Sequence, residues 1–286
     1  MNARARFELR LPSRSLKMGH RTLIMGVLNV TPDSFYDGGR YFKFEKAINR
    51  GMQLEAEGAD ILDIGGESTR PLRSGTVTAS EEMKRVVPVI ERLVKCLSIP
   101  ISVDTSKAEV ARAALAAGAQ IVNDISGFRF DAGMPTVVAA SKAAVVLMHS
   151  RGTPESMHRL GGIRHVVRVV LDGLRRAVHK AVKAGVHRNR IIVDPGLGFG
   201  KQPEDNLLLL KKLDKLTALK LPVLVGASRK SFVGKILEVP PAERLSGSLV
   251  CAALAIFSGA HILRVHDVRE TLQVAKICDA VMNSSR

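Results

Sequence analysis

Tryptophan is absent from this chain of 286 residues, which has only two tyrosines and three cysteines. Without aromatic residues interleaved with basic ones, the chain lacks the stacking surface on which single-stranded nucleic acids usually bind. Cys96, Cys251 and Cys278 are widely separated and lie in apolar or helix-like stretches. We therefore expect neither a disulfide framework nor a zinc site, and we expect all three cysteines to be buried as small hydrophobic residues.

Long apolar runs are also missing. No run of about 18 uncharged apolar residues occurs, and arginines interrupt the N-terminal segment MNARARFELRLPSRSLKMGH. We therefore expect no membrane span, no secretory signal and a cytoplasmic location.

Acidic residues are scarce relative to basic ones, and the formal net charge is +16. Residues 4–21 carry six basic residues against Glu8, and residues 159–190 carry nine against Asp172, in a pattern typical of one face of an amphipathic helix. We interpret this charge as a solvated surface with a diffuse attraction for anions, and we expect no nucleic-acid partner. The competing interpretation, a noncatalytic nucleic-acid-binding protein, predicts binding that falls steeply with salt.

Short runs rich in valine and isoleucine recur along the chain, each followed by a loop and a helix-length segment. Eight such runs occur, at residues 23–30, 59–65, 100–104, 120–125, 144–149, 191–194, 222–226 and 261–266. Because they are apolar almost throughout, they indicate strands buried on both faces, as in a parallel sheet covered by helices. The alternation predicts a (β/α)8 barrel over residues 21–286, preceded by a basic extension at 1–20. A doubly wound open sheet is the alternative.

Several helix boundaries are marked in the sequence. Capping-box pairs predict helix starts; they are Thr78 with Glu81, Ser106 with Glu109 and Asp267 with Glu270. Pro88 is expected to kink the helix that follows Thr78. Gly118 and Gly259 lie where C-terminal caps are expected.

Every apolar run ends in polar residues. They are Asn29, Asp63, Asp104, Asn123, His149, Asp194, Ser228 with Lys230, and Arg264 with His266. One or two of them could be helix caps, but eight such ends converging on one face of a barrel indicate an active site. Carboxylates and an asparagine between apolar strands suit a flat heterocycle with several N–H donors. Arg264, His266 and Lys230 lie after the last two strands, where barrels commonly bind phosphate.

Nine motifs follow one another in register between about Leu23 and Val281, and together they resemble the dihydropteroate synthase family. The motifs are GVLNVTPDSF, DIGGESTRP, SVDTSK, NDISG, MHSRGTP, DPGLGFGK, GASRKSFVGK, ERLSGSL and RVHDV. The resemblance implies a (β/α)8 barrel that binds a pterin deep in the barrel and works as a homodimer. It also implies a transferase of folate biosynthesis that joins para-aminobenzoate to 7,8-dihydropterin-6-ylmethyl diphosphate, and a target class of sulfonamides.

The same resemblance implies roles for individual residues. The implied pterin pocket comprises Asp104, Asn123, Asp194 and Lys230, with Phe199 and Gly226 beside the ring. The implied diphosphate site comprises Asn29, Arg264 and His266, with Mg²⁺ held by Asn29 and the diphosphate oxygens, and with Asp63 behind that centre. The residues expected to be catalytic are Asn29, Lys230, Arg264 and His266. An ionised Asp194 would accept hydrogen bonds from the 2-amino group and ring N–H, since two such donors favour the charged carboxylate.

Two loops, TPDSFYDGGRYF and ESTRPLRSGT, are rich in turn-forming residues and lack helix or strand periodicity. We expect them to act as mobile lids. Residues that match the family's arylamine pocket are Phe35, Thr69, Arg70, Pro71 and Ser231. Ser231 lies at the expected start of a short helix, where its hydroxyl could bind the carboxylate of para-aminobenzoate or simply serve as the N-cap.

The chain departs from the family's motifs at Tyr36, where serine is common, and at Ala227, where threonine or methionine is common. These positions lie near the expected arylamine side and put inhibitor affinity in doubt more than the reaction class. The nearest rival is a methyltetrahydrofolate-dependent methyltransferase, another barrel with an acidic pterin pocket. The SRKS and RVHDV motifs and the two arylamine loops argue against it.

Overall fold

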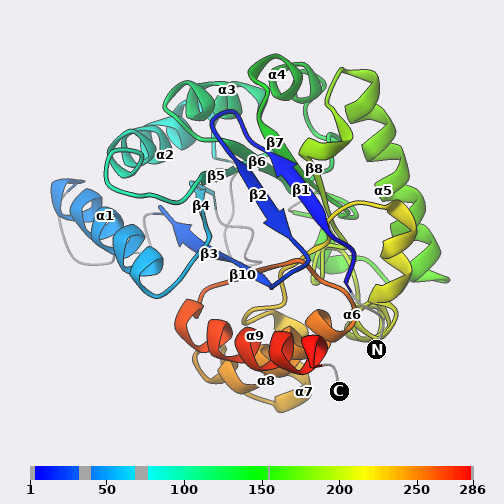
Figure 1. Ribbon diagram of the computed structural model, residues 1–286. Coiled ribbons are helices and arrows are strands. Elements are labelled where there is room, and N and C mark those ends of the chain that lie inside the picture. The colour runs from blue at the N-terminus through cyan, green and yellow to red at the C-terminus, as the bar shows by residue number, and fades with distance from the viewer. Residues whose placement is uncertain (1–3, 32–39, 68–76, 154, 285–286) are drawn as a thin grey trace.

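The computed structural model describes residues 4–31, 40–67, 77–153 and 155–284. Within them, eight parallel strands lie side by side in the order β8, β7, β6, β5, β4, β3, β10, β9. A bridge between Val193 and Val223 joins the two edges of this sheet, so the strands close into a barrel inside a ring of helices (Figure 1). The predicted (β/α)8 fold is confirmed, and the alternative of an open sheet is wrong.

The strands of the barrel are β3 (Leu23–Asn29), β4 (Ile61–Gly65), β5 (Ile101–Asp104), β6 (Ile121–Asp124), β7 (Ala144–Met148), β8 (Ile191–Asp194), β9 (Leu224–Val225) and β10 (Ile262–Val265). The helices are α1 (Arg40–Ala56), α2 (Ala79–Leu93), α3 (Ala108–Ala116), α4 (Met134–Ser141), α5 (Val166–Lys183), α6 (Pro203–Lys211), α7 (Ser231–Leu237), α8 (Leu245–Phe257) and α9 (Val268–Asn283). Short 3₁₀ turns are η2 (Met157–Arg159), η3 (Arg188–Arg190), η4 (Leu213–Leu219) and η5 (Pro241–Glu243).

All eight predicted strands are present, because each apolar run packs on both of its faces. In β3, for example, Ile24 and Leu28 belong to the core between strands and helices, whereas Leu23 and Met25 belong to the core inside the barrel. Successive side chains of a strand point to opposite faces, so a strand in this position must be apolar at nearly every residue. Most polar groups therefore lie at the carboxyl ends of the strands.

The helix signals are confirmed in part. Thr78 and Glu81 form the expected capping box of α2, which continues through Pro88, and Gly118 and Gly259 adopt positive φ after the ends of α3 and α8. The predicted start at Ser106 is wrong: α3 begins at Ala108, and its first N–H donates to Asp131, a carboxylate remote in sequence.

The predicted cap at Asp267 is correct in position only. Asp267 directly precedes α9, but its side chain makes no capping hydrogen bond, because the carboxylate pairs with Arg229 instead.

One cysteine prediction is also wrong. Cys251 and Cys278 are buried, whereas Cys96 is exposed in the turn that follows α2. Among the described helices, none is both long and apolar enough to cross a bilayer.

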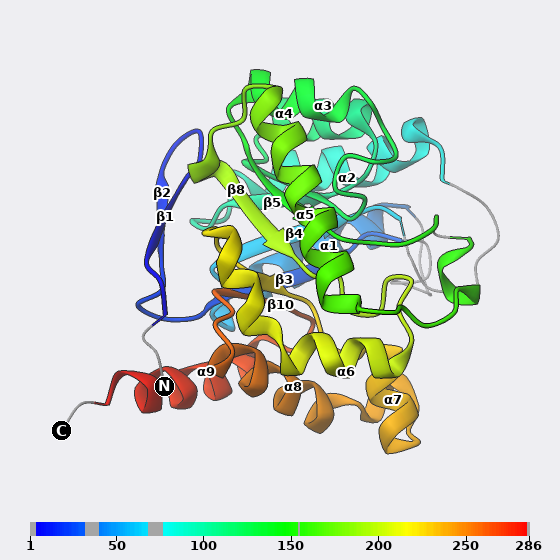
Figure 2. The same ribbon diagram turned by 90° about the vertical axis from the view of Figure 1, so that its right-hand side faces the viewer.

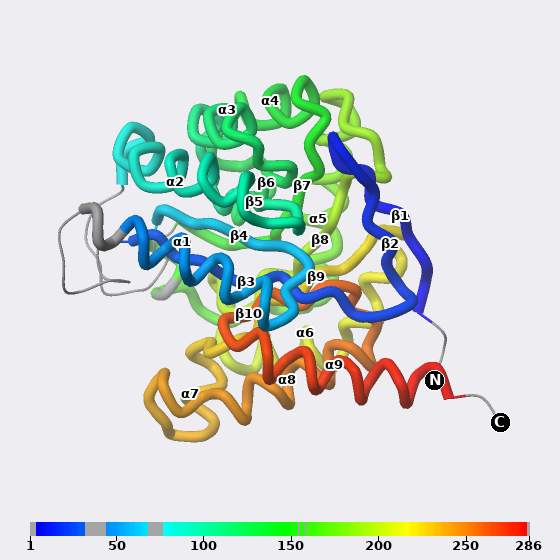
Figure 3. The backbone as a smooth tube through the Cα atoms, turned by 60° about the vertical axis from the view of Figure 1, so that its left-hand side comes forward, coloured from blue at the N-terminus to red at the C-terminus, as the bar shows by residue number. Residues whose placement is uncertain are grey.

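The basic segment before the barrel contains an antiparallel hairpin, β1 (Phe7–Arg10) and β2 (Ser15–Met18). The hairpin lies across the end of the barrel at which the strands begin (Figures 2 and 3). Leu9, Leu11 and Met18 point inward and pack against barrel residues such as Ile61 and Ile262. The basic side chains between them remain on the surface, so the hairpin closes the barrel floor.

Replacing Leu9 by alanine should lower the free energy of unfolding by about 2–4 kcal/mol, because Leu9 is 1% exposed and the truncation leaves a cavity in this floor. Urea unfolding followed by circular dichroism measures the change. Glu8→Ala is the matched control, since Glu8 is exposed on the same strand. Equal stability of the two variants would show that the hairpin does not contribute to the core.

Candidate active site

The carboxyl ends of the strands bring most of the predicted polar residues to one mouth of the barrel; the prediction is wrong for His149, whose ring packs against Gly173 of α5. Asn29 is level with Gly65 on β4, Gly65 with Asp104 on β5, and Asp104 with Asn123 on β6. Residues that are level on neighbouring parallel strands project to the same face, so this row lines the barrel mouth. The predicted convergence of Asn29, Asp104 and Asn123 is thus observed.

Arg264, on β10, is the ionic centre of this mouth. Its Nε donates to Oδ2 of Asp63 at 2.6 Å, and its Nη2 donates to Oδ2 of Asp104 at 2.6 Å. The same oxygen of Asp63 accepts from Nδ2 of Asn123 at 3.0 Å. Burial opposes the charge of Arg264, but the two carboxylates outweigh it and raise the pKa of the guanidinium. Neither ion pair uses Nη1, which is therefore the donor most suited to a further anion.

The two carboxylates bound by Arg264 are not equivalent. Asp63 is completely buried. Asp104 is nearer the mouth, with a side chain 21% exposed. Burial raises the pKa of Asp104 above its usual range; Arg264 opposes this shift, and the charge of Asp63 adds to it. The ion pair with Arg264 is therefore the contact that favours the carboxylate form of Asp104.

Asp194 lies across the mouth at the end of β8 and is 4% exposed. Its Oδ1 accepts from the N–H of Gly196 at 2.6 Å. Burial raises its pKa to about 6, against the effects of that N–H and of Lys230. Gly196 has positive φ, and a Cβ there would lie 2.1 Å from the carbonyl oxygen of His149, so only glycine fits. The turn that presents the N–H to Asp194 is therefore fixed by its sequence.

Lys230 and Phe199 complete the wall beside Asp194. The Nζ of Lys230 lies 4.0 Å from the centre of the Phe199 ring, which is a cation–π contact. Burial and Arg264 lower the pKa of Lys230 to about 8, although Asp194 and Asp104 favour its charge. Gly226 lies beside Arg264, whose Cβ would be 3.7 Å from a Cβ at that position. Phe199, Gly226 and Lys230 therefore lie at the same barrel mouth as Asp194 and Arg264.

Lys201 ends the DPGLGFGK motif, and the sequence predicted no role for it. Its Nζ is buried and donates to three carbonyl oxygens, those of His149 at 3.0 Å, Gly196 at 2.8 Å and Phe199 at 3.1 Å. Burial lowers its pKa to about 7, whereas three acceptors favour the ammonium form. Lys201 thus holds together the loop that carries Gly196 and Phe199. The glycine-rich DPGLGFGK motif was the only sign in the sequence of this role, since a glycine-rich loop needs a side chain that holds its backbone in place.

His266 follows β10, and its ring is held by Ser228. The distance from Ser228 Oγ to His266 Nδ1 is 3.0 Å, and the same hydroxyl accepts from the backbone N–H of His266 at 3.2 Å. The sequence placed Ser228 at a strand end without assigning it a partner. Burial lowers the pKa of His149, the corresponding residue after β7, to about 3, so His149 stays neutral.

The arylamine side is only partly described. Phe35, Thr69, Arg70 and Pro71, together with Tyr36, lie outside the described residues. Ser231 is exposed and is the first residue of α7, which confirms the expected helix start. The N-cap is Lys230, so the alternative role of Ser231 as the N-cap is wrong. Its backbone position at the helix start remains compatible with a carboxylate ligand.

Comparisons with known proteins agree with this geometry. A family model described as "Pterin binding enzyme" matches residues 25–266. The dihydropteroate synthase of Bacillus subtilis (strain 168) is 46% identical over 269 residues, which are 94% of this chain and 92% of the relative.

Two solved structures of Xanthomonas albilineans dihydropteroate synthase are also similar. The one with 4-aminobenzoic acid is 42% identical with a TM-score of 0.91, and the match covers 98% of this chain and 100% of that one. The one with 7,8-dihydropteroate is 41% identical with a TM-score of 0.87, over 97% and 100% of the two chains. The chain therefore belongs to the pterin-binding enzyme family, and within it to the dihydropteroate synthases.

Proposed function

We propose that this chain condenses para-aminobenzoate with 7,8-dihydropterin-6-ylmethyl diphosphate to give 7,8-dihydropteroate and pyrophosphate. The proposal rests mainly on the ion pairs of Arg264 with Asp63 and Asp104. They place hydrogen-bond acceptors and a cationic donor in the same barrel mouth. Asp104, Asn123 and Asp194 offer acceptors to a heterocycle with several N–H donors. Arg264, His266 and Lys230 supply the donors that an attached diphosphate requires.

Within this arrangement, the chain's side chains assist the leaving group. The amine nitrogen forms a bond to the 6-methylene carbon while the bond from that carbon to the diphosphate oxygen breaks. The electron pair leaves with the diphosphate, and the nitrogen loses a proton. An aromatic amine is already unprotonated at neutral pH, so the site needs no strong general base. Arg264 and His266 offset the charge that develops on the diphosphate, which is where preorganised donors lower a barrier most.

A magnesium ion fits the same mouth. Among the described residues no three His, Cys, Asp or Glu side chains form a metal cage, but Mg²⁺ bound through diphosphate oxygens needs only one or two protein ligands. The amide oxygen of Asn29 is suited to this role, since it lies at the barrel mouth beside Gly65, near the carboxylate of Asp104. When bound there, the ion would supply positive charge to the leaving diphosphate.

The activity is tested with the purified chain, the dihydropterin-methyl diphosphate and Mg²⁺, with and without para-aminobenzoate. We expect release of pyrophosphate that depends on the amine, together with dihydropteroate detected by chromatography. Pterin binding without any amine-dependent product would instead support the methyltransferase alternative and reject the proposal.

Pterin affinity should depend on pH through Asp194. Burial raises the pKa of this carboxyl to about 6 in the free protein, and N–H donors of the pterin bind only its ionised form well. The dissociation constant should therefore be constant above pH 7 and rise as pH falls through 6, by up to about tenfold per unit. Calorimetric titrations between pH 5 and 8 measure it. Affinity that is flat over this range would remove Asp194 from ring recognition.

We also propose that two copies of the chain associate through α8 and α9, which pack against each other. Their outer faces carry apolar side chains, with exposed fractions of 59% for Val250, 49% for Leu254 and 68% for Ile277. Val250 and Leu254 are one helical turn apart, so they form a continuous stripe, and exposed apolar patches of this kind mark association sites. Light scattering should give a dimer for the wild type and a monomer for Val250→Lys.

A further inference from the structure

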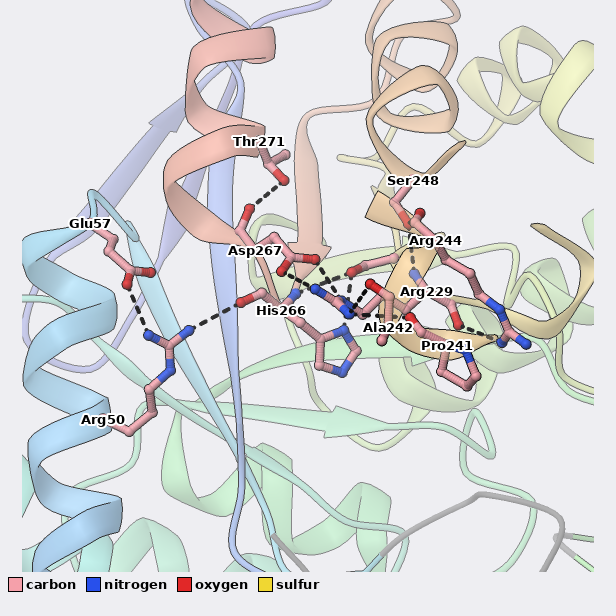
Figure 4. Close-up of polar contacts among 11 residues, drawn as sticks. Arg50, Glu57, Arg229, Pro241, Ala242, Arg244, Ser248, His266, Asp267 and Thr271 are labelled. Atoms are coloured by element: carbon pink, nitrogen blue, oxygen red, sulfur yellow. Dashed lines mark hydrogen bonds and ion pairs between the residues drawn. The ribbon is translucent and has the colours of Figure 1, made fainter. Parts of the chain in front are cut away.

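The loops after β9 and β10 are tied together by one ion pair outside the predicted site. Arg229 lies between Ser228 and Lys230, and its Nε and Nη2 donate to the two carboxylate oxygens of Asp267 at 2.9 and 2.7 Å. Its Nη1 donates to the carbonyl oxygens of Pro241 and Ala242, both at 3.2 Å (Figure 4). A bidentate pair of this type fixes direction as well as distance.

The backbone of Arg229 is held just as firmly. Its φ is +54°, a left-handed value that costs a non-glycine residue about 1 kcal/mol and persists only where the surroundings impose it. The N–H of Arg229 donates to Oγ of Ser248 at 2.9 Å, and its carbonyl accepts from Nη1 of Arg244 at 3.2 Å. Arg244 passes over Gly234 so closely that a Cβ there would lie 2.1 Å from its Nε. The conformation between Ser228 and Lys230 is thus set from both sides.

A separate set of contacts fixes His266 on the other loop. Ser228 holds its ring and its backbone N–H, and Nη2 of Arg50 on α1 donates to its carbonyl oxygen at 3.2 Å (Figure 4). Asp267 is the next residue along the chain. The ion pair therefore links Arg229 to Asp267. Arg229 precedes Lys230, whose ammonium faces the ring of Phe199, and Asp267 follows His266, which lies on the anion side.

We propose that Arg229 and Asp267 are positioning residues that set the placement of Lys230 relative to His266 and Arg264. This inference rests on the proposed function, in which one substrate carries both a pterin and a diphosphate. A shift of about 1 Å in such a framework is enough to lower a rate about 100-fold. Breaking the Arg229–Asp267 pair should weaken binding only of a ligand that contacts both the pterin side and the anion side. Each side keeps its other contacts when the pair is broken.

The test compares two ligands that differ only in the diphosphate, 6-hydroxymethyl-7,8-dihydropterin and its diphosphate ester, by calorimetry with Mg²⁺ present. In the wild type we expect the ester to bind more tightly than the alcohol. In Arg229→Gln and in Asp267→Asn, this ratio of affinities should fall about tenfold or more, with the alcohol bound as in the wild type. The double variant should lose no more than the worse single variant, because the two residues act as one unit.

Arg21→Gln is the matched control. It breaks a bidentate pair with Asp60 at the opposite end of the barrel, so it reports the effect of losing an arginine–aspartate pair far from the site. Its affinity ratio should equal that of the wild type. An unchanged ratio in both Arg229→Gln and Asp267→Asn would overturn the inference while leaving the proposed function intact. A wild type that binds neither ligand would reject the proposed function and, with it, the inference.

Discussion

Replacing Arg264 by alanine should lower kcat/KM for the diphosphate substrate by about 10³-fold or more. The guanidinium lies between the carboxylates that accept from it and the expected diphosphate site. Losing one preorganised donor alone lowers the rate about 10²–10³-fold. In addition, Asp63 and Asp104 lose their cation and are left as neighbouring carboxylates, of which Asp63 is completely buried. Removing one partner of a buried pair typically costs about 3–5 kcal/mol of stability.

Both consequences can be measured on one set of proteins. Steady-state kinetics give kcat/KM, and urea unfolding at pH 7.5 gives the free energy of unfolding. Arg264→Lys keeps the positive charge but has no forked pair of donors, so it should recover part of the stability and little of the rate. Arg175→Ala is the matched control, because Arg175 is exposed on α5 and pairs only with Asp172 among the described residues. Arg264→Ala with wild-type turnover would contradict the assignment of the leaving-group site.

The barrel could be predicted because each short strand combines a run of buried apolar residues with a polar residue near its end. Ile191, Ile192 and Val193 are buried on alternating faces, and Asp194 is the first residue that reaches the mouth. Apolar residues thus identify the strand, and the polar residue after them identifies the site. The same reasoning gave Asp104 and Asn123, which the structure places level with each other.

The remaining features depend on contacts between residues distant in sequence. The hairpin was hidden because Leu9 and Leu11 alternate with charged and turn residues, and only the barrel floor gives them a surface to pack on. The start of α3 was misplaced because Asp131 satisfies its first N–H. Lys201 and Arg229 received no role from the sequence, since nothing local shows that one donates to three carbonyl oxygens and the other pairs with Asp267. Sequence patterns report burial and periodicity, whereas these partners are set by tertiary structure.

Asp194→Asn should weaken binding of the pterin about 10²-fold or more. The amide replaces one carboxylate oxygen by an NH₂ group, which cannot accept from a pterin N–H, and the remaining oxygen already accepts from Gly196. Leaving a buried donor without its acceptor costs about 1–3 kcal/mol, and more when the lost acceptor is charged. Calorimetric titration with 6-hydroxymethyl-7,8-dihydropterin measures the loss directly and does not depend on turnover.

The same substitution should have the opposite effect on stability. Burial raises the pKa of Asp194 to about 6 in the folded chain, above its value in the unfolded chain, so the folded state holds the extra proton between about pH 4 and 6. Wild-type stability therefore falls as pH rises through this window, because the empty site must bury a charge. Asparagine does not titrate, so the stability of Asp194→Asn relative to the wild type should increase from pH 5 to pH 8.

Asp124→Asn provides the comparison that separates the two effects. Asp124 is also a buried carboxyl at a strand end with a pKa raised by burial, but its oxygens accept from the backbone N–H groups of Ser126 and Phe128. Its neighbour Asn123 faces the barrel, so Asp124 faces the helices. Asp124→Asn should therefore lose stability and keep pterin affinity. Wild-type affinity in Asp194→Asn, or an equal loss of affinity in Asp124→Asn, would mean that the ring is not recognised by Asp194.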